Sequence, residues 1–171
     1  MRIIYLSSSL TVILVIIVWF VIHMAAALIG LKVPDRFIDP SLRIYRPAGW
    51  ESGGRLYEKV FLVRKWKQIL PDGGNWFRGG FAKRKLSSVS PEYIKMFIRE
   101  TCRAELTHWL AFFPALLFFF WVEWKVGLIM VGYGLMVNLP CIITQRYNRF
   151  RMERFLVRLS DVDQRRGRSK T

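Results

Sequence analysis

The sequence has 171 residues, of which 53% are hydrophobic and 15% aromatic, and its formal net charge is +15. This length allows one domain, and the apolar content argues against a water-soluble protein. In a soluble protein such a charge would suggest nucleic-acid binding. Attraction to anionic lipid headgroups explains the charge here, so no nucleic-acid partner is expected.

The first apolar segment, residues 3–31, has 29 consecutive positions without Asp, Glu, Lys or Arg. About 20 apolar residues suffice to cross a bilayer core, so this segment predicts a transmembrane helix. It is about twice as long as the apolar part of a signal peptide. A signal peptide cleaved near Ala25–Ala27 remains the alternative. His23, within this segment, is expected to pack against or hydrogen-bond to another helix.

Residues 32–105 carry 16 Lys or Arg against 8 Asp or Glu, which predicts a basic cytoplasmic loop. Arg55–Leu70 mixes large apolar residues with cations and is interpreted as an amphipathic helix in the headgroup region. Pro71–Gly74 is expected to end that helix as a turn. Ser90-Pro91-Glu92 then predicts a helix start, because it combines a hydroxyl cap, an early proline and an acid in the first turn.

Two further apolar segments, residues 106–121 and 126–144, predict a hairpin of transmembrane helices. Residues 145–171 carry 9 Lys or Arg against 3 Asp or Glu, and we expect a basic cytoplasmic tail that is disordered over 164–170. The chain is thus predicted to be a single-domain, all-α integral membrane protein of the cell membrane. It would have three transmembrane helices and interfacial amphipathic helices on the cytoplasmic side, with its N-terminus outside.

Glu105 and His108 fall on the apolar face of the helix that starts at Ser90, one turn apart. An ionisable pair at that position costs several kcal/mol unless its members contact each other or another polar group, and intramembrane ionisable residues are functional candidates by default. The alternative is a hydrogen-bonded pair that only fixes helix packing.

The cytoplasmic end of the third apolar segment carries a polar stripe: Asn138, Gln145 and Arg149, with Arg146 and Asn148 at its edge. In the predicted topology this stripe, Asp35 and the Glu105–His108 turn reach similar depths, which predicts one site at the inner membrane surface. Interfacial Arg, Gln and Asn side chains also bind lipid headgroups, and that alternative stays open.

Cysteine and histidine usage argues against a metal centre. Cys102 and Cys141 have no CxxC spacing and are expected to pack, while the chain has two histidines in all. We therefore expect neither a metal nor a bound cofactor.

Four strings occur in order along the chain: KVPDRF at 32–37, FLVRKWKQILPDG at 61–73, ETCRAELTHW at 100–109 and NLPCIITQRYNRFR at 138–151. Together they resemble the glycosyl-4,4'-diaponeurosporenoate acyltransferase family of small membrane enzymes. The resemblance implies transfer of a fatty acyl chain to the sugar hydroxyl, at C6 of glucose, of a glycosylated C30 carotenoid acid. Acylation of another glycolipid, or a non-catalytic scaffold role in such a pathway, are the alternatives.

Acyl transfer from a thioester to an alcohol needs a base and a donor to the developing oxyanion. His108 is the candidate for the base, and Glu105 could orient its imidazole. The candidates for substrate binding are Arg146, Gln145, Asn148, Arg149, Asn138 and Asp35. The thioester co-substrate, acyl coenzyme A or an acyl carrier protein, is anionic. Arg64, Lys65 and Lys67 beside Trp66 are therefore candidates for docking it, although an interfacial helix uses such a run for anionic lipid too.

Overall fold

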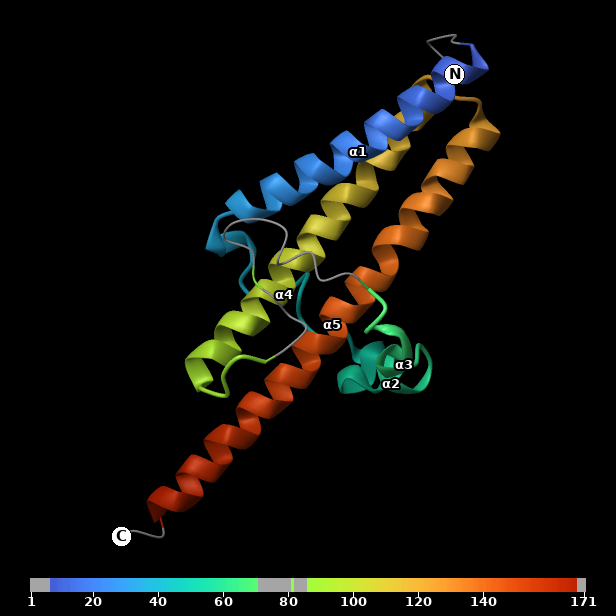
Figure 1. The fold of residues 1–171 in the computed structure, drawn as a ribbon. Helices are drawn as coiled ribbons and strands as arrows, with labels where there is room; N and C mark the ends of the chain where they lie inside the picture. The colour runs from blue at the N-terminus through green and yellow to red at the C-terminus, as the bar shows by residue number, and fades with distance from the viewer. Residues whose placement is uncertain (1–6, 71–80, 82–85, 169–171) are drawn as a thin grey trace. The chain divides into compact units, whose positions relative to one another are not determined.

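The computed structural model describes residues 7–70, 81 and 86–168, and within them all regular structure is helical (Figure 1). The chain forms two compact units: unit 1 comprises residues 1–33 and 104–142, and unit 2 comprises residues 34–103 and 143–171. Two helices contribute residues to both units, α4 (Pro91–Phe112) and α5 (Trp124–Arg168). The prediction of an all-α protein is confirmed, whereas the expected turn at Pro71–Gly74 lies outside the described residues.

Helix α1 (Ser8–Lys32) is capped at its N-terminus by Ser7, whose hydroxyl accepts a hydrogen bond from the amide of Leu10 at 3.4 Å. Its buried residues are Trp19, Ala26 and Gly30, which recur on one face. At Gly30 an added Cβ would lie 2.1 Å from Oγ1 of Thr107 in α4, so the absence of a side chain permits this close approach. The other large apolar residues of α1 are mostly exposed, among them Ile16 and Phe20.

Helix α4 (Pro91–Phe112) begins as predicted, with Ser90 Oγ accepting from the amide of Tyr93 at 3.3 Å and proline in the first helical position. It is followed by a 3₁₀ helix, η4 (Phe113–Phe120). Residues 106–121, expected as one helix, do not form one continuous α-helix. Pro114 lacks an amide proton and its ring clashes with the carbonyl four residues earlier, so the α-helix ends at Phe112.

Helix α5 runs without interruption from Trp124 to Arg168, with Pro140 inside it (Figure 1). It contains the third apolar segment. The predicted disorder of the tail was wrong as far as Arg168, because the helix continues through those residues. Among the residues that the structure describes, two helices qualify by length and composition to cross a membrane, Ser8–Lys32 and Trp124–Val162, where three were expected.

Unit 1 has an aromatic core. Trp19 of α1, Ala115 and Phe118 of η4, and Val122 form a buried cluster, with apolar residues of α1 and α5 packed around it. Trp19 stacks on Phe118 with ring centroids 5.1 Å apart, and its indole Nε1 lies 3.5 Å from the sulfur of Met130. The 3₁₀ segment thus takes part in the packing of α1.

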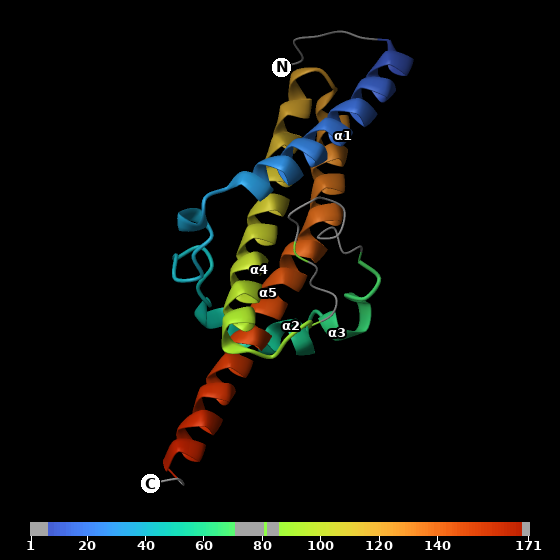
Figure 2. The same ribbon diagram turned by 60° about the vertical axis from the view of Figure 1, so that its left-hand side comes forward.

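Unit 2 contains short elements: η1 (Asp35–Phe37), η2 (Gly49–Gly54), α2 (Arg55–Lys59) and α3 (Val63–Trp66). The predicted amphipathic helix over Arg55–Leu70 is therefore corrected to two short helices, which Figure 2 shows beside each other. Leu62 separates them in a left-handed conformation with φ of 48°. An L-residue in that conformation cannot continue a right-handed helix.

Two buried clusters hold unit 2. Tyr57, Val63, Tyr147 and Phe150 form one, which ties α2 and α3 to α5. Gly54 permits this packing, because its φ is 88° and a Cβ there would lie 2.9 Å from Cβ of Phe150. The other cluster joins Ile94, Phe97 and Ile98 of α4 to Met152 of α5. The same stretch of α5 therefore packs against α2, α3 and the first turns of α4.

The close approach at Gly30 predicts that Gly30→Ala lowers the stability of the detergent-solubilised protein by about 1–3 kcal/mol, because the new methyl group overlaps Thr107. The melting temperature in detergent measures this effect. Gly132→Ala is the matched control, since a Cβ there meets nothing within 4 Å. Equal melting temperatures for the two variants would show that α1 and α4 are not packed at this point.

Candidate active site

The turn of α4 that carries Glu105 and His108 belongs to unit 1. The side chain of Glu105 is buried, with only 2% of its surface exposed, and His108 is half-buried. Their spacing of three residues places them side by side on the helix. The structure thus places an ionisable pair on the packed face of α4, where the helical pattern predicts it.

Asn138 of α5 is the residue that contacts His108 in the same unit. Its Oδ1 lies 3.1 Å from Nδ1 of His108, and its Nδ2 donates to the carbonyl of Gly134 at 2.9 Å. Asn138 is 1% exposed. The structure therefore joins two of the predicted site residues, one from each long helix.

The predicted substrate-binding residue Arg146 lies in unit 2, where it meets a buried carboxylate. Its Nε is 3.0 Å from Oε1 of Glu51, as an ion pair rather than an aligned hydrogen bond, and its Nη2 donates to the carbonyl of Arg46 at 3.3 Å. Glu51 is fully buried and also accepts from the hydroxyl of Tyr57 and from the amide of Ala48. The guanidinium of Arg146 is thus held by the fold of unit 2.

Arg149 is also an interior residue of unit 2, with 2% of its surface exposed. Its Nη1 donates to the sulfur of Cys102 at 3.3 Å, and its guanidinium carbon lies 5.5 Å from the ring centroid of Tyr45. A buried cation is tolerated only when such partners compensate for lost hydration. Cys102 and Arg149 therefore contact each other inside unit 2, and the cysteine is buried as expected.

Two predicted residues from different strings contact each other directly in unit 2. Nζ of Lys67 donates to Oδ1 of Asn148 at 3.1 Å and lies 5.0 Å from the ring centroid of Tyr147. Burial, helped by the nearby Arg151 and Arg64, lowers the pKa of Lys67. Lys67 is thus part of the packing of unit 2.

The other docking candidates lie on α3. Arg64 and Lys65 are exposed, whereas the indole Nε1 of Trp66 donates to the carbonyl of Phe61 at 2.7 Å. Two of the four predicted docking residues therefore present their charge to the surroundings, and Trp66 anchors the short helix that carries them.

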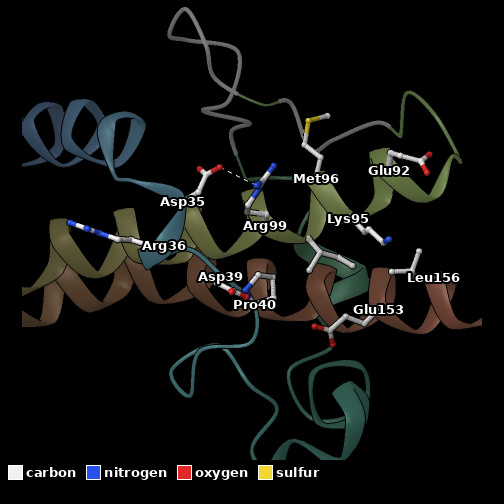
Figure 3. A pocket seen from close by; sticks show the side chains of 11 residues that line it. Asp35, Arg36, Asp39, Pro40, Glu92, Lys95, Met96, Arg99, Glu153 and Leu156 are labelled. Atoms are coloured by element: carbon white, nitrogen blue, oxygen red, sulfur yellow. Dashed lines mark hydrogen bonds and ion pairs between the residues drawn. The ribbon is translucent and has the colours of Figure 1, made fainter.

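Asp35 lines an open cavity of about 840 Å³ in unit 2, between η1 with the residues that follow it, α4 and α5 (Figure 3). Its carboxylate pairs with Arg99 at 3.0 Å and with Arg103 at 3.1 Å. The apolar parts of the lining are Pro40, Met96, Ile98 and Leu156, and charged side chains of both signs supply the rest. Such a lining suits an amphipathic molecule.

Gln145 is the remaining predicted residue. Its Oε1 is buried and has no hydrogen-bond partner among the described residues of the chain. A buried amide oxygen in this state costs free energy, so it is a candidate for accepting a hydrogen bond from a ligand. The expectation that Gln145–Arg149, Asp35, Glu105 and His108 share one site stays a prediction, because these residues are divided between the two units.

Glu51 and Tyr57 are absent from the candidates that the sequence suggests. Glu51 follows no helical or alternating pattern. The one signal in the sequence is that an acidic residue stands in the Gly-rich stretch Gly49–Gly54 of a basic segment. In the part of the chain that the structure describes, no group of three or more His, Cys, Asp or Glu side chains could hold a metal ion.

The buried ion pair predicts that Glu51→Gln lowers the free energy of unfolding by about 3 kcal/mol, because Arg146 loses its counter-charge. Glu58→Gln is the matched control: Glu58 pairs with Arg154 at 3.6 Å with both side chains partly exposed, so its effect should stay below about 1 kcal/mol. Denaturation in detergent measures both changes. Similar small losses in the two variants would refute the role of the buried pair.

Comparison with known proteins identifies the family. The model of the glycosyl-4,4'-diaponeurosporenoate acyltransferase family matches residues 41–158. Glycosyl-4,4'-diaponeurosporenoate acyltransferases of Staphylococcus aureus strains bovine RF122 / ET3-1, USA300 and NCTC 8325 / PS 47 are each 33% identical to the chain over 138 residues, which cover 81% of this chain and 83% of the relative. No solved structure matches.

The family match covers more than half of the chain, including Glu51 and the three strings that contain Lys67, His108 and Asn138. KVPDRF at 32–37 and the whole of α1 precede it. The relatives are named as acyltransferases, which makes this protein an enzyme of acyl transfer. The chain belongs to the glycosyl-4,4'-diaponeurosporenoate acyltransferase family.

Proposed function

We propose that the protein transfers a fatty acyl chain from a thioester to the sugar hydroxyl, at C6 of glucose, of a glycosylated C30 carotenoid acid. Membership of the family supports the reaction class and the acceptor. The observation that carries the choice of base is the imidazole of His108, half-buried and hydrogen-bonded to the buried Asn138. Another glycolipid acceptor is the alternative within the same chemistry.

In the proposed reaction the imidazole of His108 takes the proton of the sugar hydroxyl as its oxygen attacks the thioester carbonyl carbon. The new C–O bond forms, the C–S bond of the tetrahedral intermediate breaks, and the imidazolium returns its proton to the leaving thiolate. The products are an ester and a free thiol. Glu105, one turn away on α4, favours the charged imidazolium in the intermediate.

Sugar recognition is proposed for unit 2. The buried Oε1 of Gln145 can accept a hydrogen bond from a sugar hydroxyl, which would remove the cost of its missing partner. Arg146, held by Glu51, can donate to the acceptor or to the developing oxyanion. Asp35 and the amphipathic cavity that it lines offer a further place for the polar end of the acceptor.

The acyl donor, acyl coenzyme A or an acyl carrier protein, is proposed to dock on α3, and no bound cofactor takes part. Phosphate groups and acidic helices are both anionic, and Arg64 and Lys65 are exposed cations on one short helix. Lys67 supports α3 from inside through Asn148. The donor site would thus be attached directly to the stretch Gln145–Arg149.

We further propose a multi-pass arrangement in the cell membrane, with the N-terminus outside and the C-terminus cytoplasmic. Helices α1 and α5 are long and apolar enough to cross. Residues 106–120 would cross the membrane in the direction opposite to α1, as a broken helix. Their seven α-helical and eight 3₁₀ residues together extend about 26 Å along the helix axis. The basic segments 32–105 and 145–171 then lie inside.

The base hypothesis predicts that His108→Ala lowers formation of the acyl ester by about 100-fold or more, because general-base catalysis contributes at least that much. Membranes of cells that make the glycosylated carotenoid are analysed for the ester by mass spectrometry, with immunoblotting for the protein. His23→Ala is the matched control, since His23 contacts the carbonyl of Trp19 within α1.

Undiminished ester in membranes that contain His108→Ala would refute the base. Glu105→Gln should lower the rate by less, and loss of the protein from membranes in that variant would instead support a packing role. If the wild-type chain esterifies a different glycolipid and leaves the carotenoid glycoside unchanged, the acceptor is wrong and the chemistry stands.

Docking on α3 predicts that Arg64→Gln/Lys65→Gln raises the KM for acyl coenzyme A about five-fold without changing kcat, since two exposed charges contribute about 1 kcal/mol. Arg55→Gln/Lys59→Gln is the matched control, because it removes the same charge from exposed positions of α2. Initial rates with purified enzyme measure both constants. An equal rise of the KM in the control variant would indicate general electrostatic attraction and would contradict a defined docking site on α3.

A further inference from the structure

The side-chain amide of Asn138 has a defined orientation in unit 1. Its Nδ2 donates to the carbonyl of Gly134 one helical turn earlier, at 2.9 Å. The reverse orientation would set the amide oxygen against that carbonyl oxygen, and two acceptors cannot form a hydrogen bond. Because Asn138 is 1% exposed, water cannot compensate for such a mismatch. The amide oxygen therefore faces His108.

This orientation decides which nitrogen of His108 carries the proton. Oδ1 of Asn138 only accepts hydrogen bonds, so Nδ1 of His108, 3.1 Å away, must be the donor. A neutral imidazole has one N–H group, and the nitrogen that does not carry it holds the lone pair. Nε2 is consequently the basic atom of the ring.

We propose that Asn138 is a positioning residue that keeps His108 in the Nδ1–H tautomer and thereby makes Nε2 the atom that receives the acceptor's proton. The proposal rests on the function proposed above. It gives Asn138 the orienting role that the sequence suggests for Glu105, and it replaces substrate binding as the role of Asn138. Both polar atoms of Asn138 are engaged within unit 1, one with His108 and one with Gly134.

The surroundings of Asn138 support a fixed position. A Cβ added at Gly134 would lie 3.0 Å from the indole ring of Trp19 and 3.5 Å from Cβ of Ala115, so α5 is tightly packed at the turn whose carbonyl holds the amide. Trp19 and Ala115 belong to the buried core of the unit. The orientation of the imidazole is thus tied to the packing of α1 and η4 against α5.

The test uses the fact that the chain has two histidines, His23 and His108. In a His23→Gln variant the ring nitrogens of His108 give the only histidine signals, and ¹⁵N NMR separates protonated from lone-pair nitrogens. The full-length protein is labelled with ¹⁵N-histidine in detergent micelles, at a pH where the imidazole is neutral. We expect the Nδ1–H tautomer. An Nε2–H tautomer in this variant would overturn the proposal, whatever the activity.

Asn138→Leu, close in size but without an acceptor, should shift His108 toward the Nε2–H tautomer and lower kcat about 100-fold or more with little change in KM, because the lone pair then faces the wrong way. Asn138→Asp keeps an acceptor oxygen toward His108 and should retain the Nδ1–H tautomer, although its second oxygen faces the carbonyl of Gly134 and lowers the stability of the protein. Full activity in Asn138→Leu would overturn the positioning role.

The two proposals fail in different ways. If His108→Ala remains active while His108 shows the Nδ1–H tautomer, the proposed base is wrong and the hydrogen bond is structural. If His108→Ala is inactive while the tautomer is Nε2–H, the base stands and the role of Asn138 is refuted.

Discussion

The hydrogen bond between Asn138 and His108 is the contact on which the proposed chemistry depends. A half-buried imidazole on an apolar helix face needs a polar partner, and the amide of Asn138 supplies one while its other end is bound to the backbone of its own helix. The pair joins α4 to α5 within unit 1, whose core is completed by Trp19 of α1. Packing of apolar residues and orientation of the base are therefore linked in one unit.

Polar contacts in unit 2 connect the four strings that suggest the family in the sequence. Asp35 pairs with Arg103, Cys102 contacts Arg149, and Lys67 contacts Asn148, so each string touches another at a defined atom. A residue that pairs across strings is required for folding as well as for any role in binding. This explains why several arginines that look like ligand-binding groups in the sequence are held by protein atoms in the structure.

Glu51 gives unit 2 a buried negative charge in a strongly basic protein. The carboxylate receives the hydroxyl of Tyr57 and the amide of Ala48 and faces Arg146, which satisfies it without solvent. A guanidinium fixed in this way loses little entropy when it binds an anion or a sugar oxygen. Arg64 and Lys65 on α3 differ from Arg146, because their side chains are exposed and can reach a bulky acyl donor.

Sequence patterns alone predict the helical class, the start of α4 at Ser90, the apolar segments in α1 and α5, and the position of Glu105 and His108 on the packed face of α4. These features follow from local periodicity and capping, which act over one or two turns. Other features depend on tertiary contacts. Leu62 divides the expected amphipathic helix, and Asn138 rather than a neighbour in sequence meets Nδ1 of His108. Contacts such as Glu51 with Arg146 join residues far apart in the chain, and no local pattern encodes which distant partner a buried charge will meet.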